Sequence, residues 1–338
     1  MTTDLKDKEL EISVIIPVYN AAPFVRKAVE SALAQPETAE VLLIEDGSPD
    51  NSLEICKQLD AEYDKVRLFT HEGNANLGAG PTRNVGIENA RFDFIAFLDA
   101  DDYYLPDRFR AERRIFAEIP DAHGVYGAAG FHYYSAAGKE IYDSLGYSGL
   151  ITLQDPVPPE ELYLAISGLR PTKGYFHIDT LTLKKDIVSQ FGLRFRDTEF
   201  HQDTDFIARV TIKCRLYSGQ LQKPVVNIGV HDANRLVRNR NMLKTSALRS
   251  KHLLEWGRNS NVSQEILKVL QSQATIAEIR TKGRVSAFFT FLVEGSRNSY
   301  LFRHKLYWVQ LLARLVGGNN DTIRRLAKAR ALLRRSGS

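Results

Sequence analysis

Three carboxylates, Asp99, Asp101 and Asp102, stand within four residues directly after the apolar run 94–98. Their charges repel one another unless a cation lies between them. A hard divalent ion such as Mg²⁺ or Mn²⁺ binds one or two carboxylates together with phosphate oxygens. We therefore predict a metal and phosphate site at this position. The alternative is that Asp102 caps the turn at 105–106, which leaves Asp99 unexplained.

Two other segments offer groups that suit a nucleotide. Asp46 stands in the turn-rich sequence 45–48 (EDGS), where its carboxylate can accept a hydrogen bond from a base or a ribose, although Asp-Gly is also common in plain turns. The segment 76–84 (NLGAGPTRN) brings glycines to the start of a predicted helix, whose free N–H groups suit an anion. Arg83 adds a guanidinium fork that suits a phosphate.

Two further positions are candidates from residue type alone. The segment 199–205 (EFHQDTD) holds three carboxylates and a histidine just before apolar residues at helical spacing. Helix capping by Asp203 or Thr204 is the alternative interpretation there. His231 follows the predicted strand 225–230, although a lone histidine is more often structural than a ligand.

A sheet must bring these clusters together. Short apolar runs that predict buried strands alternate with segments at helical spacing, which predicts a parallel sheet in an α/β domain. The predicted strands are 12–16, 41–44, 66–69 and 94–98. Ligands of such sheets bind beyond the carboxyl ends of the strands. Three polar clusters fall at those ends, at 17–20, 45–47 and 99–101.

The rest of the chain has a different character. Residues 125–235 are less regular and dense in aromatics, which predicts β-structure, and helical spacing returns from about 242.

Hydrophobic residues make up 43% and charged residues 25%, as in globular proteins. Two cysteines are too few for a disulfide framework, so we expect a reducing compartment. Neither an apolar leader nor a run of about 20 apolar residues occurs, and we expect a cytoplasmic protein.

Charge is distributed unevenly along the chain. Residues 1–100 carry nine Lys and Arg against 18 Asp and Glu, whereas residues 241–338 carry 18 against five. Within the basic region, 301–338 interleaves basic and apolar residues, which is typical of a helix on an anionic membrane surface. The alternatives are a helical subdomain packed on the rest of the chain, or a homo-oligomer contact. Nucleic-acid binding is not expected, because no recognition motif accompanies the charge.

In combination, these segments resemble family 2 glycosyltransferases, inverting enzymes of the GT-A fold. The resemblance is carried by ISVIIPVYN (12–20), LIEDGSPDNS (43–52), NLGAGPTRNVGIENARFDFIAFLDADD (76–102) and HQDTDFIARV (201–210). It implies a GT-A catalytic domain over 1–235, a Rossmann-like mixed sheet flanked by helices. The nucleotide half would span about 10–110 and the acceptor half about 110–235. Residues 236–338, outside the resemblance, are expected to form a basic helical region.

The resemblance also implies roles for individual residues. On the donor side these are Pro17, Tyr19 and Asn20 in the nucleotide pocket, Asp46 on the base and Arg83 near the diphosphate. Asp99 and Asp101 would form the family's D-x-D metal motif, with Asp99 toward the ribose and Asp101 on the metal. His231 matches a histidine that some members use on the metal or the diphosphate. Asp203 matches the catalytic base. An acidic residue often precedes that base in the family, and here Gln202 stands in its place, so Glu199 and Asp205 are rival candidates.

The expected activity is metal-dependent transfer of a sugar, with inversion, from a UDP- or dTDP-linked donor to a glycan or lipid-linked acceptor. Mg²⁺ or Mn²⁺ is the expected cofactor. A sugar-phosphate nucleotidyltransferase is the rival enzyme, but its lysine-containing glycine-rich signature is missing after the first strand. A non-catalytic protein that binds nucleotide sugars is the third hypothesis.

Overall fold

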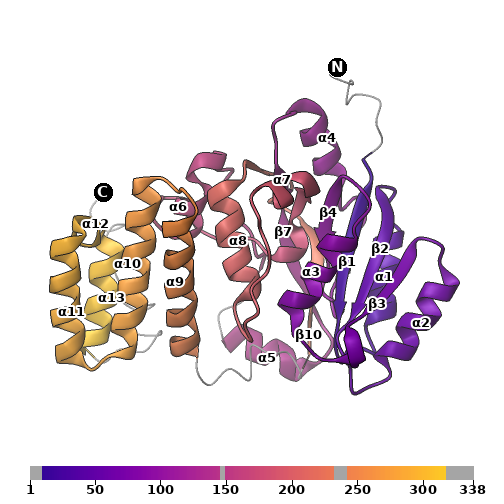
Figure 1. The fold of residues 1–338 in the computed structure, drawn as a ribbon, viewed down its shortest axis with the longest axis horizontal. Coiled ribbons are helices and arrows are strands. Elements are labelled where there is room, and N and C mark those ends of the chain that lie inside the picture. The colour runs from indigo at the N-terminus through magenta and orange to yellow at the C-terminus, as the bar shows by residue number, and fades with distance from the viewer. Residues whose placement is uncertain (1–9, 145–148, 232–241, 317–338) are drawn as a thin grey trace. The chain divides into compact units, whose positions relative to one another are not determined.

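The computed structural model describes residues 10–144, 149–231 and 242–316. The chain divides into two compact units, residues 1–238 and 239–338. The first is a mixed α/β unit and the second is helical (Figure 1). The sequence predicted this combination of folds, and the structure confirms it.

A mixed seven-stranded sheet forms the centre of the first unit. Its strands run in the order β3 (Val66–Thr70), β2 (Thr38–Glu45), β1 (Ile12–Val18), β4 (Phe94–Phe97), β8 (Thr182–Lys184), β6 (Gly124–Tyr126) and β9 (Leu216–Ser218). The first four strands are parallel to one another, whereas β8 is antiparallel to both β4 and β6. The four strands predicted from the apolar runs are therefore the parallel half of this sheet.

Helices cover both faces of the parallel half (Figure 1). Helices α1 (Val25–Leu33) and α2 (Ser52–Glu62) pack on the face that includes Val14 and Ile16, in one apolar core. Helix α3 (Ala79–Asn89) packs on the other face. It comes so close there that a Cβ on Gly86 would lie 2.3 Å from the side chain of Ile15. This packing fixes the starts of α1 and α3 at the carboxyl ends of the strands.

A second sheet of three strands adjoins the first. It has the order β5 (Tyr103–Tyr104), β10 (Pro224–Val230) and β7 (Ala128–Tyr133), with β10 antiparallel to β5 and parallel to β7. The loop 98–102 leads from β4 of the large sheet directly into β5 of the small one. The predicted metal motif therefore lies on the connection between the two sheets.

The region 125–235 contains more helix than its sequence predicted. It holds the helices α5 (Ala136–Ser144), α6 (Leu162–Ile166), α7 (Lys185–Gln190) and α8 (Gln202–Lys213), and the 3₁₀ turns η2 (Pro159–Glu161) and η3 (Ile178–Thr180). Earlier in this unit lie the 3₁₀ turn η1 (Glu72–Asn74) and helix α4 (Arg110–Glu118). The dense aromatics of this region had favoured β-structure. Tyr126, Phe131 and Tyr133 do lie in strands β6 and β7, whereas Tyr142 lies in α5. Tyr126 also stacks on Phe176, with 4.6 Å between ring centroids.

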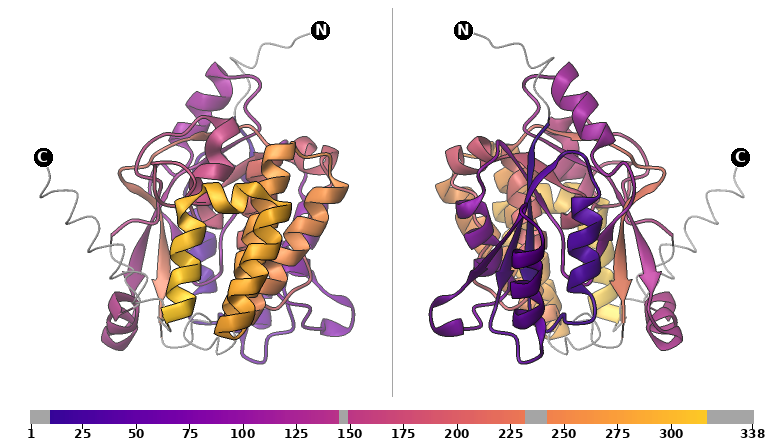
Figure 2. Two further views of the ribbon diagram at one scale, coloured as in Figure 1. Left: turned by 90° about the vertical axis from the view of Figure 1, so that its left-hand side faces the viewer. Right: turned by 90° about the vertical axis from the view of Figure 1, so that its right-hand side faces the viewer.

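The second unit consists of helices α9 (Met242–Asn259), α10 (Gln264–Thr281), α11 (Arg284–Arg297), α12 (Ser299–Arg303) and α13 (Lys305–Val316), which lie side by side (Figure 2). Helix α10 packs against α9, α11 and α13. None of the helices within the described ranges is both long enough and apolar enough to cross a bilayer. Of the predicted membrane segment 301–338, only 301–316 falls in those ranges, and 317–338 lies outside them.

Candidate active site

The loop after β4 orients its three carboxylates in different directions. Arg83 of α3 donates a short hydrogen bond to Asp99. The imidazole Nε2 of His231, which follows β10, lies 3.0 Å from a carboxylate oxygen of Asp101. Asp102 accepts a hydrogen bond of 2.8 Å from the backbone N–H of Gly229. Arg83 and His231, which are far apart in sequence, thus each contact one carboxylate of this loop.

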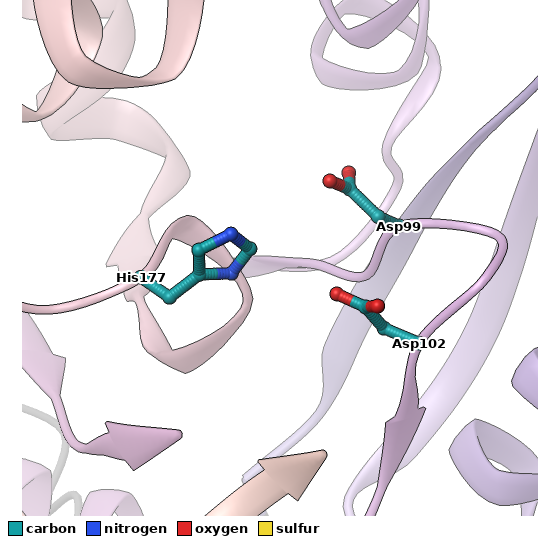
Figure 3. A group of neighbouring side chains, drawn as sticks. All are labelled: Asp99, Asp102 and His177. Atoms are coloured by element: carbon teal, nitrogen blue, oxygen red, sulfur yellow. The ribbon is translucent and has the colours of Figure 1, made fainter. Parts of the chain in front are cut away.

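A histidine and an aspartate that the sequence did not single out complete this cluster. His177 stands just before η3, and one oxygen each from Asp99 and Asp102 lies within 4.8 Å of its ring nitrogen and of each other. Figure 3 shows both carboxylates pointing toward the imidazole. The aspartate is Asp179, which is fully buried and has one carboxylate oxygen 3.6 Å from His177 Nδ1. Among the described residues, its carboxylate oxygens make no hydrogen bond of normal geometry, although His177 and Asp102 both lie close enough to lower its pKa.

Burial and mutual charge set the protonation of this cluster. Burial raises the pKa of Asp102 well above its usual range, and the charges of Asp179 and Asp101 add to the shift. Burial alone would lower the pKa of His177, but Asp179 and Asp99 outweigh it and raise that pKa to about 9. His177 is therefore a cation at neutral pH. Burial likewise would raise the pKa of Asp179, but the charge of His177 brings it below its ordinary value.

The predicted nucleotide residues lie at the ends of β1 and β2. Pro17 is buried within β1, whereas Tyr19 and Asn20 are exposed on the loop that follows. Asn20 has a positive φ of 53°, and its N–H donates to the Ser48 hydroxyl at 3.0 Å. This bond joins the loop after β1 to the loop after β2. The two loops thus form one surface at the carboxyl edge of the sheet.

Asp46 has a structural task in this arrangement. Its two carboxylate oxygens accept hydrogen bonds from the N–H groups of Leu77 and Gly78, at 2.7 and 2.9 Å. His71 Nε2 lies 3.3 Å from one of them and 3.0 Å from the Thr82 hydroxyl. Asp46 therefore fixes the glycine-containing loop at the start of α3. Recognition of a base by Asp46, which the resemblance implies, stays a prediction.

Helix α8 separates the three candidate bases. Asp205 is 2% exposed and forms ion pairs with Arg209 and Arg196, at 2.6 and 3.2 Å. Glu199 is exposed on the segment before the helix. Asp203 is half-buried in the first turn, and its charge is among those that raise the pKa of His177. Of the three, Asp203 is the one whose charge acts on the cluster at β4.

Two capping interpretations are wrong. Asp102 does not cap a turn at 105–106, because it is buried and bonds to Gly229 of β10 instead. Neither Asp203 nor Thr204 caps α8, because the helix begins after His201, whose side chain makes no capping hydrogen bond. The functional interpretation of both acidic segments is favoured accordingly.

His177 and Asp179 were missed because their segment shows no periodicity. They are carried to the site by η3 and by β8, which inserts antiparallel between β4 and β6. The sequence HIDT (177–180) offered the only signal, a histidine and an aspartate two residues apart before an apolar strand. Such a pair has no special meaning until the topology is known.

Known proteins resemble this chain most clearly in its first unit. Residues 13–136 match the family described as Glycosyl transferase family 2. An uncharacterized glycosyltransferase of Rickettsia felis is 31% identical over 242 residues, which cover 66% of this chain and 38% of the relative. The uncharacterized glycosyltransferase YibD of Escherichia coli is 47% identical over 100 residues, 29% of this chain and 28% of YibD. The chain thus spans less than half the length of these curated relatives.

Solved structures show the same fold. The crystal structure of Staphylococcus aureus TarS 1–349 in complex with UDP-GlcNAc has a TM-score of 0.60 at 15% sequence identity and covers 91% of this chain and 92% of its own. A longer TarS structure has a TM-score of 0.54 at 16% identity, covering 79% of this chain and 43% of its own. At such low identity the likeness concerns the fold alone. Residues 13–136 of this chain are thus similar to glycosyltransferase family 2, and its first unit has the GT-A fold.

Proposed function

We propose that the first unit transfers a sugar from a nucleotide-diphosphate donor, UDP- or dTDP-linked, to an acceptor hydroxyl with inversion at the anomeric carbon. The observation that carries the proposal is the convergence of Asp99, Asp101, Arg83, His177 and His231 on the connection between the two sheets. The match of residues 13–136 to glycosyltransferase family 2 supports the reaction class. The TarS complex, a protein of the same fold, binds UDP-GlcNAc.

On the donor side, the guanidinium of Arg83 is the cationic group expected to lie near the diphosphate. Arg83 is buried, and burial would lower its pKa, but Asp99 and, more weakly, Asp203 raise it above its ordinary value. The guanidinium is therefore fixed in place and charged before any donor arrives, so it need not be ordered on binding. Pro17, Tyr19 and Asn20 would line the nucleotide pocket, with Asp46 at the base, as the resemblance implies.

The side chains of Asp101 and His231 offer ligand atoms that fit a divalent ion. Asp101 and His231 are each partly exposed and bring an oxygen and a nitrogen within 3.0 Å of each other. Carboxylate oxygens together with phosphate oxygens suit Mg²⁺ and Mn²⁺. When bound, the ion neutralises charge on the departing diphosphate. Asp101 and His231 would hold it there, and Asp99 would face the ribose.

On the acceptor side, Asp203 would remove the proton from the attacking hydroxyl. Asp205 does not suit this role, because two guanidinium groups already pair with it. The acceptor oxygen then bonds to the anomeric carbon from the face opposite the diphosphate, which leaves with the electron pair of the broken bond. A single displacement of this kind inverts the configuration and needs no covalent enzyme intermediate.

The test is a donor assay with three proteins. The full chain is incubated with UDP- and dTDP-sugars and Mg²⁺ or Mn²⁺, and release of UDP or dTDP is measured. Asp203→Asn should reduce turnover at least about a thousandfold while UDP affinity changes little, and the matched variant Glu199→Gln should retain turnover. Normal turnover in Asp203→Asn, with turnover lost in Glu199→Gln, would assign the base to Glu199.

The same assay separates the rival functions. A sugar-phosphate nucleotidyltransferase would consume UTP or dTTP with a sugar phosphate and release pyrophosphate. A non-catalytic nucleotide-sugar protein would bind UDP without turnover. Release of UDP or dTDP from a nucleotide sugar is expected of neither rival.

We also propose that the second unit contacts an anionic membrane surface, which would suit a lipid-linked acceptor. Helix α11 exposes an apolar stripe over three turns, and α13 adds two more exposed apolar side chains. The stripe consists of Val285, Phe288, Phe289, Leu292 and Val293, and the residues of α13 are Trp308 and Leu312. Helices α9–α13 carry 11 Lys and Arg against four Glu. An apolar helix face on a basic unit is the arrangement that favours such a surface.

A further inference from the structure

Beside the loop that carries Asp101, a set of rings forms a patch on the small sheet and the start of α1. We call it the aromatic face, and it consists of Phe24, Tyr103, His132, Tyr134 and His231, with Lys27. Tyr134 is in the middle. Its ring centroid lies 4.9 Å from that of Phe24, 4.6 Å from that of His132 and 6.5 Å from that of His231. The exposed fraction of Tyr134 is 37%.

The alternation of side chains along β7 divides its aromatics between two faces. His132 and Tyr134 contribute to the aromatic face. Phe131 and Tyr133 stack on each other with 6.2 Å between centroids, and Phe131 packs at 5.6 Å against Tyr142 of α5. Two tyrosines adjacent in sequence thus have opposite surroundings. Tyr133 is therefore a matched control for Tyr134.

Gly229 connects the aromatic face to the proposed catalytic site. A Cβ at Gly229 would lie 2.1 Å from the carbonyl oxygen of Asp101 and 2.9 Å from the ring of Tyr134, so both pack against the same Cα. His231 makes a second connection, since it lies 3.0 Å from the Asp101 carboxylate and stacks on Phe24 with 4.7 Å between centroids. Burial, together with the charges of Tyr103, Asp101 and Asp102, raises the pKa of Tyr134. The face is thus continuous with the metal motif.

Lys27 gives the aromatic face a hydrogen-bond donor, its ammonium group. Its ammonium lies 3.5 Å from the ring centroid of Tyr103 and 3.5 Å from the Tyr134 hydroxyl. Among residues 10–144, 149–231 and 242–316, no carboxylate lies within ion-pair distance of it. A half-exposed ring beside an N–H donor is suited to a sugar, whose C–H face packs on the ring while its hydroxyls accept hydrogen bonds.

We propose that the aromatic face is a subsite for the acceptor glycan, with one sugar ring stacked on Tyr134 and a hydroxyl bonded to Lys27. The inference rests on the proposed transferase function and deepens it. The residues expected to hold the donor lie on β1, β2 and α3, whereas most of the aromatic face lies on the small sheet. Asp101, on the connection between the sheets, would then have the donor on one side and the acceptor on the other.

The experiment measures glycan binding and nucleotide binding separately. The full chain, Tyr134→Ala and Tyr133→Ala are applied to an array of bacterial surface oligosaccharides in the presence of UDP and Mg²⁺. UDP affinity is measured by calorimetry for the same three proteins. We expect Tyr134→Ala to lose about tenfold or more in glycan binding with unchanged UDP affinity, as expected when a stacking ring is removed. Tyr133→Ala should bind as the wild type does, and Tyr134→Phe, which keeps the ring, should restore most of the binding.

Three results would overturn the subsite. The first is equal glycan binding by Tyr134→Ala and the wild type. The second is a parallel loss of UDP affinity in Tyr134→Ala, which would assign the face to the donor. The third is a wild-type chain that binds no oligosaccharide on the array. Failure of the proposed function looks different, because UDP binding and donor turnover would then be missing in the wild type whatever Tyr134 does.

Discussion

In the first unit, several of the most buried side chains are charged, and Arg108, Glu112, Asp179 and Arg209 are all at most 3% exposed. In the helical unit, the described buried polar groups are neutral, and large apolar side chains such as Phe289, 60% exposed, face outward. Burying a charge costs free energy unless it is paired, and exposing a large apolar patch is unfavourable unless something covers it. Globular proteins usually expose their charges and bury their large apolar side chains. Each unit departs from this pattern at the place where we propose its function.

The first unit contains two kinds of buried charged groups. Arg108 and Glu112 pair with each other inside α4 and its neighbourhood, and Asp205 pairs with Arg209 and Arg196. In these pairs each carboxylate faces at least one guanidinium. In the group of Asp99, Asp102, His177 and Asp179, carboxylates instead lie close to one another, and burial together with their charges raises the pKa of Asp99 and Asp102. Crowding of like charges with shifted pKa values is more typical of a site that receives a ligand.

The largest expected effect comes from breaking the buried ion pair of Asp205 and Arg209. Asp205→Asn leaves Arg209 buried without its counter-charge, and we expect a loss of about 3 kcal/mol in the free energy of unfolding. Asp203→Asn, two residues away, should change stability by less than about 0.5 kcal/mol, because its side chain is only half-buried. Urea denaturation of both variants checks the contrast. Equal stabilities would mean that Asp205 does not hold α8 in place.

A pH-dependent effect of at most similar size is expected from the group around His177. His177 has an ordinary pKa of 6.5 and a pKa of about 9 in the folded chain, so its contribution is complete below pH 6.5 and is lost as the pH rises toward 9. In metal-free buffer, the wild type should lose at most about 3 kcal/mol over this range on account of His177. His177→Asn should lose less, measured by urea denaturation at pH 6, 7.5 and 9. Parallel curves for the two proteins would mean that His177 is neutral.

The smallest effect concerns the helical unit. Phe289→Ser with Val293→Ser shortens the apolar stripe of α11, and we expect about a tenfold weaker partition onto vesicles of equal phosphatidylcholine and phosphatidylglycerol. UDP binding should not change. Thr281→Ala, which alters an exposed residue at the end of α10, serves as the control. Partition of the double variant equal to that of the wild type would leave the membrane proposal without its main support.

The sequence predicted the parallel half of the fold because each strand there is a short apolar run that ends at a polar cluster. Asp99, Asp101 and Asp46 could be located for the same reason, since their places follow from strand ends. His177 and Asp179 could not, because an antiparallel strand from a segment without periodicity brings them there. The stripe on α11 was visible only as the apolar run 286–293, since burial of Ala287 and Phe291 against neighbouring helices decides which side remains exposed.

The central claim is that the connection between the two sheets is a metal-dependent donor site. It is tested most directly by release of UDP or dTDP from nucleotide sugars by the full chain, with and without EDTA, beside Asp101→Asn. We predict that at least one donor is turned over, that EDTA stops the release, and that Asp101→Asn lowers it at least about a hundredfold. Release that is unaffected by EDTA and by Asp101→Asn would contradict the claim, as would a folded wild-type chain that turns over no donor.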